Sequence, residues 1–197
     1  MRSVHMRSAL IASATAVGLF LSSSAPSAQS NMAKAEKFTA FAVDISNTAP
    51  RSNASVVDIE IKRWSTDAER DQLLEIFRAK GQDGLLAALQ KLPVVGGIRT
   101  PGSLNYDIHF ARQRSGADGG RDVFLMTDRY IGAWEATNRP RTIDYPFTLI
   151  QLQLDKNDRG LGKASVATQI TQEPDGTIVL ENFSSQPVML NEVRPAK

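Results

Sequence analysis

The sequence predicts a mainly β domain, an antiparallel sandwich or partly closed barrel of about eight strands with a two-helix hairpin inserted after the second strand. Segments in which apolar and polar residues alternate lie before and after a single helical interval. The clearest alternation is in 143–155, where the apolar residues of Ile150–Leu154 are separated by Gln151 and Gln153. That period is typical of a strand with one buried and one solvated face. Short polar turns between such segments favour antiparallel pairing.

The chain begins with a segment typical of a secretory signal peptide. Arg2 and Arg7 precede an apolar run, Ala9 to Leu21, and small residues follow. A membrane-spanning helix needs roughly 20 apolar residues, and this run is shorter. We therefore expect residues 1–30 to be removed, the protein to be exported to the periplasm or the medium, and no stable insertion into a membrane.

The remaining 167 residues are expected to form one domain. A chain of that length buries roughly 70% of its unfolded surface, which is enough for one hydrophobic core. We expect residues 31–37 to be a flexible segment and residues 38–197 to be a single β-rich domain. The sequence contains no cysteine. Disulfides, thiolate metal sites and a cysteine nucleophile are therefore excluded.

Charge does not point to a polyanionic partner. The chain has 23 Lys and Arg against 21 Asp and Glu, and the leader contains two of the arginines. The protein without its leader is formally neutral, so we expect no nucleic acid partner.

The first two strands are expected at Phe38–Ser46 and around Val57, Ile59 and Ile61. The three residues of the second strand alternate with charged side chains, which indicates one buried face.

The period then changes to that of a helix. Thr66 stands three residues before Glu69, the spacing of a capping box, and the first helix is expected to end at Gly81 in a left-handed cap. A second helix is expected over 82–92, ended by Pro93. The apolar stripes of this hairpin need a partner, and the sheet is the available one.

Six more strands are expected in the second half of the chain. The last four of them are expected to form a meander, in which each strand pairs with the next. The six segments are 104–110, 122–128, 147–155, 161–171, 177–183 and 187–193.

Four stretches resemble an uncharacterised family of exported bacterial proteins. They are GQDGLLAALQKL, GIRTPGSLNYDIHFAR, IDYPFTLIQLQLDKNDRGLGK and ENFSSQPVMLNEVRP. The resemblance covers nearly all of the chain from Phe38 to Arg194 and implies export and a single domain. It implies no activity and no site residues.

His109 is the only histidine outside the leader. Asp107, two residues earlier on the same strand face, is placed to orient its imidazole. The simpler interpretation, which we favour, is that Asn105, Asp107 and His109 form a solvated strand face. No G-x-S-x-G elbow is present to supply a serine nucleophile.

Trp134 and Glu135 form a second candidate region. With nearby Arg129 they are suited to the mouth of a pocket or to a partner surface, but Trp134 also suits the end of a sheet core, the interpretation we favour. The candidate ligand-binding residues are therefore Asp107, His109, Arg129, Trp134 and Glu135. We assign no catalytic or metal-ligating residue and expect no cofactor.

Two classes of function remain. The first is a non-enzymatic exported module that binds a small apolar or amphiphilic ligand, or a protein partner, between a curved sheet and the helix pair. The second is a secreted hydrolase that uses acidic residues or His109. The missing nucleophile and metal motifs favour the first. An apolar pocket would support binding, whereas carboxylates clustered in a polar cleft would support hydrolysis.

Overall fold

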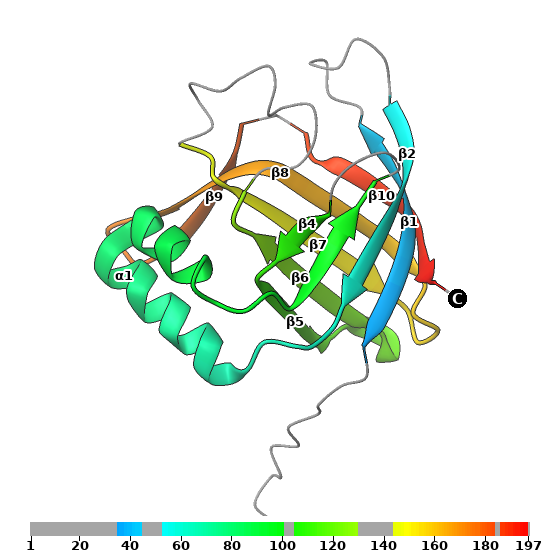
Figure 1. Ribbon diagram of the computed structural model, residues 1–197, viewed down its shortest axis with the longest axis horizontal. Helices are drawn as coiled ribbons and strands as arrows, with labels where there is room; N and C mark the ends of the chain where they lie inside the picture. Colours follow the sequence, from blue (N-terminus) through cyan, green and yellow to red (C-terminus); the bar gives the residue numbers. More distant parts are fainter. Residues whose placement is uncertain (1–34, 45–52, 101–104, 130–143, 184–185, 197) are drawn as a thin grey trace, which may run out of the picture. The chain divides into compact units, whose positions relative to one another are not determined.

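Ten antiparallel strands, one α-helix and a short 3-10 helix, η1 Ala117–Gly119, form the regular structure of the described residues (Figure 1). The computed structural model describes residues 35–44, 53–100, 105–129, 144–183 and 186–196, all within Met32–Lys197. The expected signal peptide, together with Trp134 and Glu135, lies outside them. The elements are β1 Glu36–Asp44, β2 Asn53–Ile61, α1 Asp67–Leu89, β3 Gly96–Arg99, β4 Tyr106–Ile108, β5 Phe110–Ser115, β6 Arg121–Thr127, β7 Phe147–Leu154, β8 Gly160–Gln172, β9 Ile178–Asn182 and β10 Val188–Pro195.

The sheet is nearly closed and barrel-like. Its strand order is β4-β3-β2-β1-β10-β8-β7-β6-β5, and β9 pairs with β8 beside this path. The two outermost strands, β4 and β5, are consecutive in the chain and separated by His109 alone. On one side the amide of Val95 donates to the carbonyl of Ile108, and on the other the amide of His109 donates to the carbonyl of Met126. The chain itself therefore joins the two edges of the sheet.

The predicted antiparallel, mainly β architecture is confirmed, but there are ten described strands in place of about eight. The segment predicted as one strand over 104–110 divides at His109, because its two parts pair with different neighbours, β3 and β6. Between the predicted helix over 82–92 and the predicted strand over 104–110, the structure has a further strand, β3. A Cβ at Gly96 would collide with the carbonyl of Glu60 on β2, so glycine is what allows this close pairing.

The strand boundaries also correct two smaller expectations. β1 begins at Glu36, so Glu36 and Lys37 belong to the sheet and pair with β2. The last four strands do not form a meander, because β10 lies between β1 and β8 and its described pairings are with those two strands.

The helical interval forms one element, α1, so the two-helix hairpin is not confirmed. The capping box is present: the amide of Glu69 donates to Thr66 Oγ1 at 3.2 Å, and the amide of Thr66 donates to Glu69 Oε2 at 2.8 Å. Gly81 has positive φ (64°), which glycine adopts without steric cost, and it marks a kink at which the backbone leaves helical geometry before the second part of α1 runs on to Leu89. Within the described part of the chain, no helix is long and apolar enough to span a membrane.

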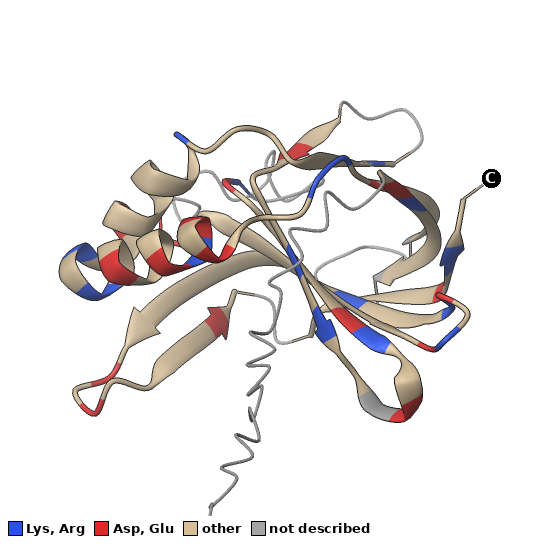
Figure 2. Cartoon of the chain, turned by 90° about the horizontal axis from the view of Figure 1, so that it is seen from below, with Lys and Arg blue, Asp and Glu red and all other residues tan. Residues whose placement is uncertain are grey.

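Two apolar clusters lie on opposite faces of the sheet. The predicted alternation of β7 is confirmed, since Ile150, Leu152 and Leu154 are buried in the interior cluster. The second cluster joins the outer face to α1, whose exposed side carries charges of both signs (Figure 2). Its buried members are Leu73, Phe77, Leu85, Leu89, Phe147 and Ile170. This second cluster holds α1 against the sheet.

Candidate binding groove

A groove of about 880 Å³ lies between α1 and the outer face of the sheet. Strands β5 to β8 form its floor, and α1 and β9 provide residues at its sides. Sites for small molecules typically have volumes of about 300 to 1,000 Å³ and mostly apolar linings. The groove is therefore large enough for a small molecule.

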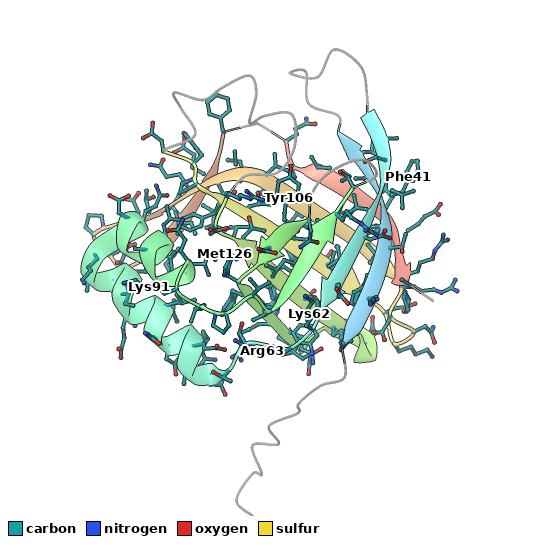
Figure 3. All side chains as sticks on the ribbon, in the orientation of Figure 1. Phe41, Lys62, Arg63, Lys91, Tyr106 and Met126 are labelled. Atoms are coloured by element: carbon teal, nitrogen blue, oxygen red, sulfur yellow. The ribbon has the colours of Figure 1, made fainter. Side chains whose placement is uncertain are left out.

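An apolar row of three side chains crosses the floor. Phe110 on β5 pairs with Met126 on β6, and Met126 pairs with Leu149 on β7. Paired residues of neighbouring strands present their side chains on the same face. Phe110 and Met126 pack on the outer face of the sheet, Leu149 shares that face through its pairing with Met126, and Figure 3 shows Met126 between α1 and the sheet. We call them the apolar row.

A second row crosses the same strands two residues farther along. Arg112 pairs with Phe124, Phe124 with Gln151, and Gln151 with Lys163 on β8. Two residues along a strand correspond to about 7 Å. We call Arg112, Phe124, Gln151 and Lys163 the basic row, because it ends in a cation on each side. The floor therefore changes from apolar to basic over a short distance.

The sides of the groove present apolar surface that no other described residue covers. On β9, Ile178 is 42% exposed and Leu180 is 55% exposed. Leu180 pairs with Ile170, which is buried against α1, so both lie on the helix side of the sheet. Leu74 of α1 also lines the groove. Exposed large apolar side chains that gather in one concave region are typical of a binding surface.

Every charged residue in the described lining of the groove is a cation: Arg70, Arg112, Arg114 and Lys163. The three arginines form ion pairs with carboxylates outside the lining, on Asp67, Asp71 and Asp122. The hydrogen bond from Arg112 to Asp67, 2.7 Å long, lowers the pKa of that exposed carboxyl. Among the described residues, no carboxylate forms an ion pair with Lys163.

His109, predicted to be a surface residue, is 9% exposed and therefore buried. Its Nδ1 donates to the carbonyl of Leu92 at 3.0 Å, and its Nε2 lies 3.7 Å from Asp128 Oδ1. The strand alternation breaks here because the chain changes pairing partner, and Ile108 and His109 are both buried. Asp107 does not orient the imidazole: its Oδ1 accepts a hydrogen bond from Asn105 Nδ2 at 3.1 Å.

Arg129 lies beside β4, with its guanidinium 5.1 Å from the centre of the Tyr106 ring. None of Asp107, His109 and Arg129 lines the groove. The structure therefore places three predicted residues near the junction of β4 and β5 and brings different residues together in the groove. The one sequence signal for the groove was the run of 122–128, which is apolar on both faces.

A second, polar cavity of about 1,090 Å³ lies along β1, β2 and β3. Its carboxylates are already paired: Glu60 Oε1 lies 3.1 Å from Lys37 Nζ, and Asp58 Oδ2 lies 3.8 Å from Arg99 Nη2.

The described residues contain no group of three or more histidine, aspartate or glutamate side chains that could hold a metal ion. The groove therefore offers apolar contact and positive charge from its own side chains. Comparisons of the chain with protein-family models, with curated proteins and with solved structures find no significant match.

Proposed function

We propose that the protein is an exported, non-enzymatic binding module that takes a small apolar or amphiphilic ligand into the groove between α1 and the sheet. The observation that carries the proposal is the groove itself, about 880 Å³ in volume, with large apolar side chains on its floor and sides. Removing apolar surface from water stabilises a complex by about 25 cal/mol for each Å². A ligand that covers Leu180 and the apolar row therefore binds favourably through this contact alone, and no catalytic group is needed.

Export is the part of the proposal that rests on the leader sequence. Residues 1–30 have the charged start, short apolar run and small residues of a secretory signal. A binding module outside the cytoplasm would meet amphiphiles that are present in the surrounding water.

Titration with an uncharged apolar fluorophore tests the proposal. N-phenyl-1-naphthylamine added to the purified protein should show saturable binding with increased fluorescence. Leu180→Gln should weaken this binding about threefold or more, because it replaces apolar contact with an amide that must be desolvated. Absence of saturable binding would contradict the proposal.

Leu161→Gln provides a matched control. Leu161 is also on a strand and is 54% exposed, nearly the same as Leu180 at 55%, but it does not line the groove. Its substitution should leave the affinity unchanged. Equal losses for the two variants would show that the fluorophore binds exposed leucines in general and not the groove.

The alternative, a secreted hydrolase, has less support. Its histidine would be His109, which is buried and hydrogen-bonded to the carbonyl of Leu92. Its carboxylates would be Asp58 and Glu60 of the polar cavity, and each lies beside a cation. Hydrolysis of a chromogenic ester or glycoside that is lost in both Asp58→Asn and Glu60→Gln would favour this alternative.

A further inference from the structure

The groove floor has two chemically different parts that one molecule can contact together. In the apolar row, Phe110 and Met126 pack against the cluster that joins α1 to the sheet, and Leu149 lines the groove beside them. The basic row lies about 7 Å farther along the same strands. A purely apolar ligand would leave the amide of Gln151 and the ammonium of Lys163 next to hydrocarbon, where polar groups lose hydration without a partner. A ligand with an apolar tail and a polar head satisfies both rows.

The positive charge of the groove lining determines which polar head group the ligand can carry. Arg70, Arg112, Arg114 and Lys163 line the groove, and no carboxylate does so among the described residues. The arginines are partly neutralised by aspartates outside the lining. Lys163 is exposed and has no ion pair with any described carboxylate. A cationic head placed in this row would be repelled, whereas an anionic head would gain a charge partner.

Lys163 and Gln151 are positioned to act together on such a head. They are directly paired across β7 and β8, so their side chains leave the same face side by side. The ammonium has three hydrogen-bond donors and the amide has two, and an oxyanion offers acceptors only. The Gln151 side chain makes no hydrogen bond to another described residue, so its donors are open to a ligand.

We propose that the ligand is a single-chain anionic amphiphile, with its tail along the apolar row beside α1 and its carboxylate or phosphate head at Gln151 and Lys163. This inference rests on the proposed function and adds the charge of the ligand and its orientation. Carboxylate and phosphate heads share the chemistry that these donors recognise.

Calorimetric titration with a set of twelve-carbon amphiphiles, each below its critical micelle concentration, tests the inference. The set is dodecanoate, dodecyl phosphate, dodecyl maltoside and dodecyltrimethylammonium. Dodecanoate and dodecyl phosphate should each bind at least about fivefold more tightly than dodecyl maltoside. Dodecyltrimethylammonium should bind more weakly than the maltoside. The tighter of the two anions identifies the preferred head.

Substitution of Lys163 tests the orientation. Lys163→Gln should weaken dodecanoate binding about threefold to fivefold and leave dodecyl maltoside unchanged, because only the charged head uses the ammonium. Lys80→Gln is the matched control: Lys80 is an exposed lysine on α1 that does not line the groove. It should change neither affinity.

The outcomes separate the inference from the proposed function. Equal binding of all four heads, or equal effects of Lys163→Gln and Lys80→Gln on dodecanoate, would overturn the inference. Saturable binding of the uncharged fluorophore in that case would leave the proposed function intact. Failure of both the fluorophore and dodecanoate to bind would overturn the two together.

Discussion

Leu89→Ala tests whether α1 is held against the sheet, as the groove requires. Leu89 is fully buried (0% exposed) in the cluster between α1 and the outer face of the sheet, with Phe77, Phe147 and Ile170. The change removes three carbons, which corresponds to about 2.4 kcal/mol at about 0.8 kcal/mol for each buried methylene. The cavity left behind adds to this cost. We expect the free energy of unfolding to fall by about 3 to 4 kcal/mol.

Urea denaturation followed by circular dichroism measures this change. With a denaturant dependence of about 2 kcal/mol per molar urea, the midpoint should fall by about 1.5 to 2 M. Leu161→Ala is the control, because Leu161 is 54% exposed and its truncation should cost less than about 0.5 kcal/mol. A midpoint for Leu89→Ala within about 0.3 M of the parent would refute the docking of α1.

Three further predictions concern the helix cap, the buried histidine and the leader. The hydrogen bond from Arg63 lowers the pKa of Glu69 below its ordinary value of 4.5. The charged carboxylate therefore stabilises the folded protein at pH values above 4.5, and this stabilisation is lost as the pH falls through the lowered pKa. The difference in free energy of unfolding between the protein and Glu69→Gln should therefore shrink between about pH 5 and pH 3, and a constant difference would contradict this. His109→Ala should cost about 1 to 3 kcal/mol in urea denaturation, because the Leu92 carbonyl loses its donor and a buried ring is removed, and a cost below about 0.5 kcal/mol would argue against burial. Expressed in a bacterium, the chain should be recovered from the periplasm or medium at a mass lacking residues 1–30, whereas the full-length form in the membrane fraction would refute export.

Features that depend on neighbouring residues were predictable from the sequence. β7 begins at Phe147, as the predicted strand 147–155 does, because the preceding Pro146 has no amide hydrogen to donate. The capping box of Thr66 and Glu69 forms as its spacing indicates. The hairpin between β7 and β8 likewise follows from a polar turn between two alternating segments.

Features that depend on distant residues were not predictable. β3 has two glycines and only four residues, so its side chains show no strand pattern, and its pairing becomes clear only beside β2 and β4. The groove is assembled from one helix and five strands, and nothing near Lys163 in the sequence marks it as part of the lining. The predicted candidates were chosen by residue type, and residue type does not show which surfaces meet.

The sequence by itself determined the balanced charge, the lack of any cysteine chemistry and the two faces of strands such as β7, because these depend on composition and on a two-residue period. Only the tertiary structure decided that the chain joins both edges of the sheet at His109, which buries that side chain. It also decided that Gln151 and Lys163 stand side by side in the groove. The reason is that the strand period determines which side chains share a face, whereas the register between strands far apart in the sequence determines which of them become neighbours.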